Sequence, residues 1–550
     1  MPRTAHYMRP QRRMGQSAGV AAIPIQANTS REDGSLDYEV NDLAGALTVT
    51  TERTWHIEVP HQLDDDAERR FKLAPNPHNQ CGPLLSAQVP VVTASDWGSL
   101  MAAFDKRCNT VHKDDVGDAE YETMCRLIDA IQFEEDPWHD NDVDRELWLA
   151  KFDVAKAGRM RKASLAFADA EAGTLGDKTL SVKLEALLKR CDPVFAARVI
   201  YSGSDAFNAV TGPAALEVMR RMELIFASQP LGPIHYRTAY KKNDVTMACH
   251  LADEIDDCPF VVEGDYSAND KHQRNRVHKL FNRFLKKIRM PDWLPWLLTK
   301  MNTFRVVNYK FGIKATLSDQ LPTGTTFTTP RNTLWNALQF SVACLEQEVQ
   351  LGYANVLGDD LLACLQQELD LPRWIACVDR CRMVLKAKAP ALNGEATFLS
   401  KRLILNTPTP CMVPLLGKAL ARFNARAVYD GAKTHSQYMA GKALSYMYEF
   451  RHVPFLRDYF YTRFEREDKS RLSLEDLTWG AKTSGIDIEN VLDFVKNEKV
   501  LVSDDNFLDW VMDVYDIGLV DVDELFSLII LDDKPIMVDH PAVDRIAIDW

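Results

Sequence analysis

The sequence predicts an α+β fold in which an antiparallel sheet is flanked by helices. Two segments read as strands that run into carboxylates: "CPFVVEGDY" at residues 258–266 and "YANVLGDDLLACL" at residues 353–365. The second segment has the pattern of a hairpin, because a Gly-Asp pair stands between two apolar runs. A third segment, residues 276–288, places apolar side chains at helical spacing and basic ones on the other face. Helices beside a sheet that bears a hairpin indicate the α+β class.

Further elements follow along the chain. Residues 335–349 read as a helix, and residues 383–388 ("MVLKAK") and 396–405 ("ATFLSKRLIL") read as short strands. The last 130 residues are predicted to be mainly helical. Residues 1–75 show little periodicity and many polar side chains, so we expect a basic, partly disordered N-terminal arm there.

The composition is that of a globular protein with several parts. The chain has 550 residues, of which 46% are hydrophobic and 26% charged. It has no run of about 18 apolar residues, so we predict no transmembrane segment. The eleven cysteines are scattered without a C-x-x-C pair, and we expect them to be reduced, with no structural zinc.

The net charge of −13 is unevenly distributed. Residues 501–550 hold thirteen Asp or Glu and two Lys or Arg, which leaves −2 for the other 500 residues. A nearly neutral body can still carry a basic channel, so the overall acidity does not exclude a nucleic-acid partner. The first thirty residues carry four arginines and no acid. That pattern favours a flexible basic arm, with a transit peptide as the alternative.

Three aspartates form the main functional signal. Asp359 and Asp360 interrupt an apolar run, and Asp265 ends a strand. Buried carboxylates are costly unless they are paired or hold a metal ion. Carboxylates at a strand end and on a hairpin turn are placed to hold two divalent ions. Taken alone, the Gly-Asp-Asp stretch favours an ordinary turn, and the rest of the chain must decide.

A further signal lies between these aspartates, in "LPTGTTFTTPRNTLWNALQF" at residues 321–340. Gly324, Thr328 and Asn332 recur at intervals of four residues. A flexible turn here leads into a helix whose first turns present hydroxyls and an amide, groups that suit a sugar hydroxyl and a template backbone. Helix capping explains the helix start but leaves the second interval unexplained.

In this order, the signals resemble motifs A, B and C in the palm of viral RNA-directed RNA polymerases. Motif A is matched by Asp265 and Asp270, the (S/T)-G-x-x-x-T-x-x-x-N pattern of motif B by Thr323, Gly324, Thr328 and Asn332, and the G-D-D of motif C by Gly358, Asp359 and Asp360. "MVLKAK" resembles motif D, in which a lysine protonates pyrophosphate. "EATFLSKRL" resembles the motif E hairpin that steadies the growing strand.

Upstream, residues 181–217 resemble the fingers motif F of tombusvirus-like and nodavirus-like replicases from positive-strand RNA viruses. Lys183, Lys189 and Arg198 match its basic positions. Ala197 replaces the usual proline, and Gly203 stands where a second arginine is common. These departures leave the number of triphosphate contacts open, and Lys241 and Lys242 are therefore added as candidates. The resemblance covers about residues 145–425.

The resemblance implies a right-hand polymerase of fingers, palm and thumb. The expected divisions are the arm at 1–75, an N-terminal extension with the fingers at 76–255, the palm at 256–405 with a fingers insertion at about 274–320, the thumb at 406–500, and an acidic C-terminal segment at 501–550. The implied activity is that of an RNA-directed RNA polymerase, a nucleotidyltransferase that copies a viral RNA genome by a two-metal reaction.

The resemblance also implies a role for each residue. Asp265 and Asp359 would hold two Mg²⁺ ions, with Mn²⁺ as a substitute, and Asp360 would be the less direct ligand. The other implied roles are proton donation by Lys386 or Lys388, nucleotide binding by Arg198, Lys183, Lys189, Lys241, Lys242, Asp270, Gly324, Thr328 and Asn332, and contact with the primer or product by Phe398, Ser400 and Lys401.

The implied partners are an RNA template, the nascent RNA and nucleoside triphosphates, with other replicase, viral or host factors left open. The expected location is the host cytoplasm, either at membrane-associated replication sites reached through partners or inside a virion. Two other classes remain as alternatives. A reverse transcriptase is disfavoured by Leu357-Gly358 and by the Asn332 amide. A non-catalytic replicase scaffold should have lost Asp265 or Asp359, and both are present.

The acidic C-terminal segment is not explained by the resemblance. Its apolar residues, including Phe507, Trp510 and Phe526, are too numerous for a solvated tail, so we expect the segment to fold and pack on the thumb or across the front of the palm. Its carboxylates then either face water, which we favour, or lie near an RNA channel as an electrostatic gate.

Overall fold

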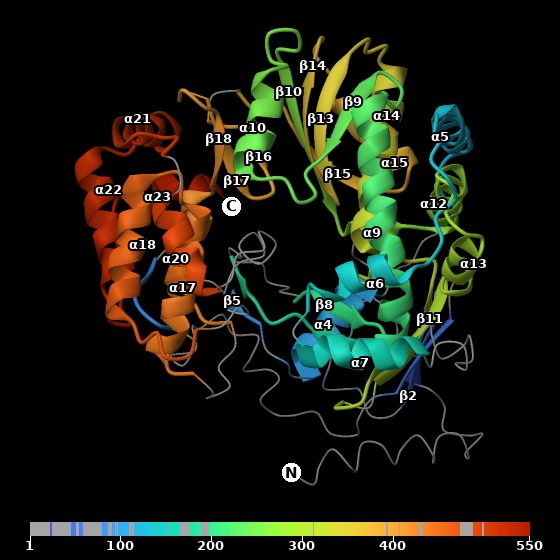
Figure 1. Cartoon of the computed structure of the whole chain (residues 1–550), viewed down its shortest axis with the longest axis horizontal. Helices are drawn as coiled ribbons and strands as arrows, with labels where there is room; N and C mark the ends of the chain where they lie inside the picture. Colours follow the sequence, from blue (N-terminus) through green and yellow to red (C-terminus); the bar gives the residue numbers. More distant parts are fainter. Residues whose placement is uncertain are drawn as a thin grey trace.

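Three groups of secondary structure make up the protein (Figure 1): a five-stranded sheet with its helices, a four-stranded sheet, and a bundle of C-terminal helices. The computed structural model describes residues 23–24, 46–50, 54–58, 80–85, 91–93, 95, 97–108, 115–152, 154–165, 177–188, 197–311, 313–391, 394–405, 407–427, 433–472, 488–497 and 500–549. Most of the basic N-terminal arm, and Lys189, lie outside these residues.

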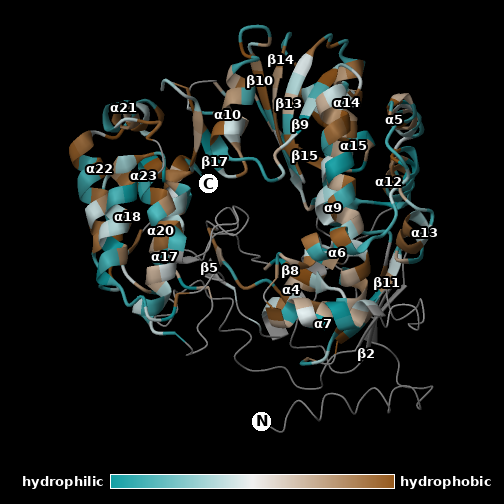
Figure 2. Cartoon of the chain, viewed as in Figure 1, coloured by the Kyte–Doolittle hydropathy of each residue, from teal (hydrophilic) through white to brown (hydrophobic). Residues whose placement is uncertain are grey.

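The five-stranded sheet, called the central sheet below, has the strand order β15-β10-β14-β13-β9. Its strands are β9 (Ile234–Thr238), β10 (Phe260–Ser267), β13 (Gly352–Leu357), β14 (Asp360–Leu365) and β15 (Val384–Lys388). β9 pairs with β13 in parallel, and the other three pairs are antiparallel. β13 and β14 form the predicted hairpin. Figure 2 shows mainly hydrophobic colours on β10 and β14 and hydrophilic colours on the loops at their ends.

Both faces of the central sheet are covered, because successive side chains of a strand point to opposite faces. Val262 and Tyr266 pack in a cluster with helices on one face, whereas Val261 packs in a second cluster on the other. The first face is covered by α5 (Asp118–Ala130), α9 (Asp205–Ser228), α12 (Asn275–Lys287), α13 (Trp293–Lys300), α14 (Thr328–Glu346) and α15 (Leu371–Arg380). The second is covered by α10 (Asp244–Ala252) and by the small sheet of β16 (Thr397–Phe398), β17 (Lys401–Ile404) and β18 (Cys411–Pro414).

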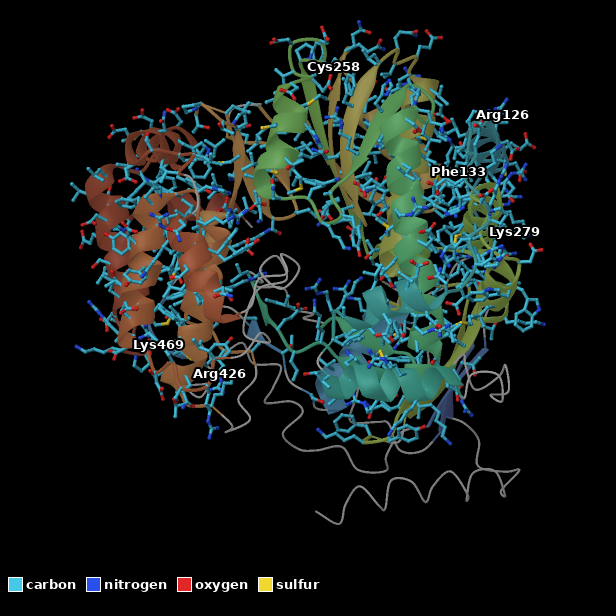
Figure 3. The ribbon with its side chains drawn as sticks, in the orientation of Figure 1. Arg126, Phe133, Cys258, Lys279, Arg426 and Lys469 are labelled. Carbon is cyan, nitrogen blue, oxygen red and sulfur yellow. The ribbon has the colours of Figure 1, made fainter. Side chains whose placement is uncertain are left out.

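The amphipathic helix predicted from residues 276–288 is α12. Its apolar side chains, including Leu280 and Phe284, are buried in the first cluster. Its basic face points outward, and Figure 3 shows Lys279 at the outer edge of the molecule, as it does Arg126 of α5. The apolar pattern of residues 396–405 predicted one strand, whereas the resemblance to motif E implied a hairpin. The segment is a hairpin, β16–β17, because Leu399 and Ser400 take positive φ angles and reverse the chain.

The four-stranded sheet has the order β12-β11-β6-β8 and packs against α4. The elements of this group are α4 (Trp97–Cys108), α6 (Asp142–Leu149), α7 (Val154–Leu165), β6 (Lys178–Val182), β8 (Val199–Ser202), β11 (Thr303–Asn308) and β12 (Ile313–Ser318). Two further small sheets consist of short strands. β1 (Ile23–Pro24), β2 (Ala46–Thr50) and β3 (Thr54–Glu58) form one sheet, and β5 (Val91–Val92) pairs with β7 (Ala186–Leu187). The remaining short helix, α11 (Asn269–His272), directly follows β10.

The C-terminal bundle is almost entirely helical, as predicted. It consists of α16 (Leu416–Phe423), α17 (His435–Glu449), α18 (Pro454–Arg466), α20 (Ile488–Asn497), α21 (Asp504–Tyr515), α22 (Leu519–Phe526), the π-helix η5 (Ser527–Leu531), α23 (Ala542–Ile546) and the 3-10 helix η6 (Ala547–Asp549). One short parallel sheet joins β19 (Met537–Val538) to β4 (Leu84–Leu85). Phe507, Trp510 and Phe526 are buried in the bundle core, so the acidic segment folds as part of the bundle.

The acids of this segment face water with one exception. Asp521 and Asp532 are half-buried and ten others are exposed, whereas Asp549 is buried. This distribution agrees with the favoured alternative, in which the acids are solvated. The ten cysteines in the described part of the chain are free thiols. Among the described residues, no helix combines the length and the apolar character needed to cross a bilayer.

Candidate active site

The tip of the β13–β14 hairpin presents two carboxylates in a fixed position. Leu357 pairs with Asp360, so the turn consists of Gly358 and Asp359 alone. Gly358 takes a φ of +63°, a conformation that glycine adopts without strain. The Gly358 N–H donates to Thr333 Oγ1 at 2.9 Å, and Asn336 Nδ2 donates to the Gly358 carbonyl at 3.3 Å. Both partners belong to α14, which therefore anchors the tip.

A third carboxylate lies beside the tip. Asp265 of β10 is the direct partner of Asp360 in the antiparallel pair β10–β14, so their side chains share one face of the central sheet. Asp265 is exposed, and Asp359 and Asp360 are half-buried. Burial, followed by Asp270 and then Asp265, raises the pKa of Asp359 to about 6. Burial, followed by Asp359 and then Asp265, raises the pKa of Asp360 to about 7.

These shifts describe a concentration of negative charge that a cation would relieve. Within the described part of the chain, no three or more His, Cys, Asp or Glu side chains are grouped so as to hold a metal ion by themselves. The carboxylates still fit Mg²⁺, because this ion keeps several waters and uses one or two carboxylates together with substrate phosphates.

The two lysines predicted for proton transfer lie at different distances along β15. Lys386 is the direct partner of Asp265 in the pair β10–β15, whereas Lys388 is the partner of Glu263. Both lysines are exposed. Lys386 therefore stands next to the carboxylates, and Lys388 stands two residues further from them.

Asp270 forms the centre of a buried polar cluster with motif B. Its carboxylate accepts from Thr323 Oγ1 at 2.5 Å and from Asn332 Nδ2 at 2.7 Å. Burial raises the pKa of Asp270, while these two hydrogen bonds and the charge of Arg331 oppose the rise. Gln273, which the sequence analysis did not identify, donates to Asn332 Oδ1 at 2.5 Å. The amide of Asn332 is thereby fixed in one orientation.

The motif B loop is held by its own side chains. Gly324 takes a φ of +90°, and its N–H donates to Thr328 Oγ1 at 3.2 Å. Thr328 Oγ1 in turn donates to the Pro322 carbonyl at 3.2 Å. The Thr328 hydroxyl thus shapes the loop that leads into α14, and Asn332 is the closer of the two to the Asp270 carboxylate.

Three of the cations predicted for the triphosphate, Arg198, Lys183 and Lys242, are paired with acids. Arg198 Nε donates to Glu185 Oε1 at 2.6 Å, and its Nη2 contacts Glu185 Oε2. Lys183 Nζ lies 3.3 Å from the same Oε2. Lys242 is paired with Glu223, and Lys241 lies over the ring of Tyr240. Glu185 and Glu223 were not identified from the sequence, because the pairing of Glu185 with Arg198 and of Glu223 with Lys242 depends on the tertiary fold.

The predicted motif E residues lie in the β16–β17 hairpin and contact other parts of the protein. Phe398 is buried with α10 and β14 in the second cluster of the central sheet. Ser400 lies in the turn, and its carbonyl accepts from the Leu415 N–H at 3.1 Å. Lys401 Nζ lies 2.7 Å from Asp244 and 2.8 Å from Glu449. Burial lowers the pKa of Lys401, but the two carboxylates outweigh burial and hold this pKa above its usual range.

The charge of one lysine of the bundle interacts with the charges of the carboxylates. Lys418 of α16 is half-buried, and the charges that act on it include Asp549, Asp360 and Asp265. Burial, followed by Arg422, lowers the pKa of Lys418, and the carboxylates oppose this effect. Lys418 lies in the range predicted as the thumb, residues 406–500, but no sequence pattern distinguishes it there.

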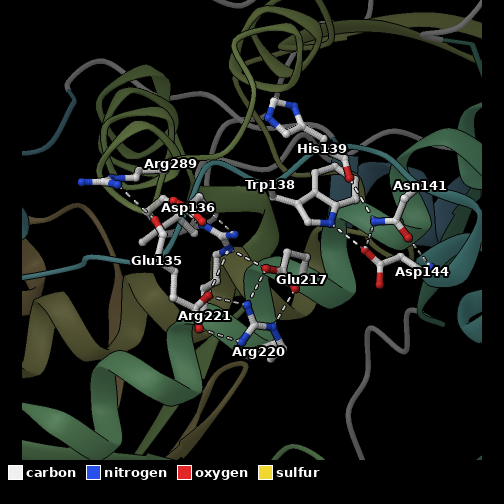
Figure 4. Close-up of polar contacts among 11 residues, drawn as sticks. Glu135, Asp136, Trp138, His139, Asn141, Asp144, Glu217, Arg220, Arg221 and Arg289 are labelled. Carbon is white, nitrogen blue, oxygen red and sulfur yellow. Dashed lines mark hydrogen bonds and ion pairs between the residues drawn. The ribbon is translucent and has the colours of Figure 1, made fainter.

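A separate open groove of about 770 Å³ lies between α9 and the loop from α5 to α6. Figure 4 shows its main contacts: Arg220 lies between Glu135 and Glu217, and Arg221 also contacts Glu217. None of the predicted site residues lines it. Arg220, Arg221, Glu135 and Glu217 are engaged in ion pairs that join the loop to α9.

Comparison with known proteins identifies the class. Residues 187–449 match the model of a family described as RNA dependent RNA polymerase. The matched range contains the three carboxylates and the residues of motifs B, D and E. No curated protein matches the chain. The predicted enzyme class is therefore confirmed, and the reverse transcriptase and the non-catalytic scaffold are not supported. The closer likeness to tombusvirus-like and nodavirus-like replicases stays a prediction.

Proposed function

We propose that this chain is an RNA dependent RNA polymerase of a positive-strand RNA virus, as the family match supports, and that it copies a viral RNA genome by nucleotidyl transfer at the β13–β14 hairpin tip. One observation carries the proposal: Asp265 and Asp360 are direct partners across β10–β14, and Asp359 is the next residue on the turn. The three carboxylates thus lie together on β10 and the hairpin tip, an arrangement that suits phosphoryl transfer between anionic groups.

We assign the polymerase layout to the three groups of the fold. The central sheet with its helices is the palm, and the C-terminal bundle is the thumb, extended by residues 501–550. This palm includes β9, which lies before residue 256 in the range expected for the fingers. The four-stranded sheet and its helices are the fingers. In this assignment β11 and β12, from the predicted insertion at about 274–320, complete the fingers sheet with β6 and β8.

The carboxylates of Asp265 and Asp359 would hold the divalent ions, and Asp360 would support them. When bound, the ions would lower the pKa of the attacking 3′-hydroxyl and offset charge on the departing pyrophosphate. The chain itself fixes the two carboxylates: α14 holds the hairpin tip through Gly358, and the β10–β14 pairing holds Asp265 opposite Asp360.

Arg198 and Lys183 would bind the triphosphate of the incoming nucleotide. Guanidinium groups bind phosphate as they bind carboxylate, through two parallel hydrogen bonds. Glu185 occupies this position on Arg198 in the free protein. The triphosphate would therefore replace Glu185 on Arg198 or share the guanidinium with it. Lys386, opposite Asp265, would give the proton to the leaving pyrophosphate.

Asp270 and Asn332 would recognise the ribose 2′-hydroxyl, which separates ribonucleotides from deoxyribonucleotides. The two side chains are bonded to each other and held by Thr323 and Gln273, so they are oriented before a nucleotide arrives. Base selection needs no side chain, because pairing with the template supplies it.

Primer extension on homopolymeric RNA, with and without primer, tests the proposed function. We expect synthesis of the complementary RNA in the presence of Mg²⁺ or Mn²⁺. The comparison of primed and unprimed reactions also reports how synthesis starts. An enzyme that is folded, binds RNA and yet incorporates no ribonucleotide on any homopolymer would contradict the proposal.

Asn332→Ala should lower the preference for ribonucleotides over deoxyribonucleotides. A site that hydrogen-bonds a hydroxyl rejects an analogue without it, so removing the amide should reduce the ratio of kcat/KM for ATP to that for dATP by at least about tenfold. Asp270→Ala should act in the same direction. Asn275→Ala, an exposed change in α12, is the matched control and should leave the ratio unchanged. Equal ratios in all four proteins would refute this role.

Divalent-ion binding should strengthen as pH rises. Asp359 and Asp360 have pKa values of about 6 and about 7, so both carry protons at low pH and compete with the ion there. Calorimetric titration with Mn²⁺ should show a dissociation constant at least about tenfold lower at about pH 8 than at about pH 5.5. A dissociation constant that does not change over this interval would contradict metal binding by these carboxylates.

A further inference from the structure

Asp549 is the one buried acid in an otherwise solvated acidic segment, and its side chain is fully enclosed. Its Oδ1 accepts from Arg402 Nη2 at 2.9 Å and from Arg402 Nε at 3.1 Å. Its Oδ2 accepts from the Gly417 N–H at 2.7 Å. The Tyr515 hydroxyl lies 3.2 Å and 3.1 Å from the two oxygens. Every oxygen of this carboxylate is therefore engaged.

These contacts join four elements at one point: η6, β17, α16 and α21. Figure 1 shows the C-terminal end of the chain beside β17. Gly417 lies at the first turn of α16, where a carboxylate accepts a free N–H and interacts favourably with the helix dipole. The approach is close, because a Cβ atom on Gly417 would lie 2.0 Å from the Ile546 carbonyl oxygen. The position of α16 is thus set by the segment that contains Asp549.

One path leads from this point to the carboxylates of the palm through Lys418. Lys418 directly follows Gly417 and experiences the charges of Asp360 and Asp265 as well as that of Asp549. A displacement of α16 would move the Lys418 ammonium relative to these acids. Lys418 belongs to the C-terminal bundle, whereas Lys386 and Arg198 come from the palm and the fingers.

A second path runs through the palm itself. Arg402 of β17 is the direct partner of Thr397 on β16. The Thr397 N–H contacts Glu263 Oε1, and the Thr397 hydroxyl donates to Glu263 Oε2 at 2.9 Å. Glu263 precedes Asp265 on β10 by two residues and points to the same face. Arg402 is therefore connected, through Thr397 and Glu263, to β10, the strand that carries Asp265.

We propose that Asp549 is a positioning residue for RNA synthesis: by bonding both Arg402 and Gly417, it fixes β17 and α16, and with α16 the backbone of Lys418, relative to the strand that carries Asp265. This inference rests on the proposed function of these carboxylates. It gives the segment at residues 501–550 a role in the reaction in place of the electrostatic gate considered from the sequence. The exposed acids of the segment take no part in it.

A purely structural role makes a different prediction. Removing one partner of a buried ion pair leaves the other charge uncompensated, so a structural role predicts that Asp549→Asn lowers the fraction of folded enzyme. Burst amplitude in a pre-steady-state reaction counts active sites, so kcat per active site separates positioning from folding. A double-mutant cycle compares the effect of Asp549→Asn on kcat with and without Lys418→Met. It therefore shows whether the effect of Asp549 on kcat depends on Lys418.

The test uses the full chain with Asp549→Asn, Lys418→Met, both together, and Asp544→Asn as the matched control on the exposed face of α23. We expect Asp549→Asn and Lys418→Met each to lower kcat per active site by about tenfold, with KM for nucleotide changed by less than about threefold. The double variant should be no slower than the slower single variant, and Asp544→Asn should equal the wild type. The proposal would be overturned if the two effects on kcat multiplied in the double variant. It would also be overturned if kcat of Asp549→Asn equalled that of Asp544→Asn.

Tyr515→Phe keeps the proposal testable if Asp549→Asn does not fold. It removes one hydrogen bond to Asp549 and keeps those of Arg402 and Gly417. We expect a fall in kcat per active site of about threefold that disappears in the Lys418→Met background; no fall, or the same fall in both backgrounds, would contradict positioning. Asp359→Asn is included as a reference. If that variant is active, the proposed function of the carboxylates fails, whereas an inactive Asp359→Asn beside a normal Asp549→Asn rejects only this inference.

Discussion

Asp359→Asn should lower kcat for nucleotide incorporation by at least about 10³-fold, because charge stabilisation by a metal-bound carboxylate site is worth several kcal/mol in the transition state. Asparagine keeps the size of the side chain and the turn, so the hairpin and its contacts with α14 should persist. RNA affinity should change by less than about threefold, since phosphate contacts elsewhere hold the RNA. Single-nucleotide incorporation and RNA binding on the same preparation measure both quantities.

Asp379→Asn is the matched control for this prediction. Asp379 is exposed on α15, and the substitution removes the same charge from the surface. Its kcat should equal that of the wild type. An Asp359→Asn enzyme that extends a primer at nearly the rate of the Asp379→Asn enzyme would show that the hairpin tip is not the reaction centre.

Lys386→Leu is expected to have the second largest effect, a fall in kcat of at least about 10²-fold with little change in KM for nucleotide. The reason is its register: Lys386 is the direct partner of Asp265, so its ammonium stands beside the place where the pyrophosphate would leave. A proton donor acts in the transition state and contributes little to ground-state binding, which is why kcat should fall alone. Steady-state kinetics with one nucleotide and a primed template measure both parameters.

Lys388→Leu provides the comparison, because it removes the same charge two residues along the same exposed strand face. Its partner is Glu263 and not Asp265, so kcat should fall by less than about threefold. A larger loss in Lys388→Leu than in Lys386→Leu would reverse the assignment. Equal losses would indicate that the two lysines act through general electrostatics and that neither is a specific proton donor.

The sequence was sufficient for the parts of the site that depend on local patterns. Gly358 between two apolar runs predicted the hairpin, and the structure has a two-residue turn at that position. The intervals of four residues from Gly324 to Asn332 predicted a helix start with polar side chains, and α14 begins at Thr328. Such features follow from the conformation of a few neighbouring residues, which is why one sequence contains enough information to predict them.

Other features depended on contacts between distant segments. The sequence left Lys386 and Lys388 as equal candidates, because only the register of β10 with β15 distinguishes them. It assigned Lys401 to the growing strand, whereas the ammonium lies between Asp244 and Glu449, which are remote in sequence. It also gave no indication that Glu185 pairs with Arg198 or that Asp549 is buried. Ion pairs of this kind depend on the tertiary fold and leave no periodic pattern.

The most direct test of the central claim is single-nucleotide extension on four primed RNA hairpins that differ only in the templating base, each offered the four ribonucleotides separately. We expect the wild type to extend each hairpin by one nucleotide, and only with the complementary ribonucleotide. The Asp359→Asn enzyme should extend none of the four hairpins. Extension that ignores the templating base, or that persists at the same rate in Asp359→Asn, would contradict template-directed RNA synthesis at this site.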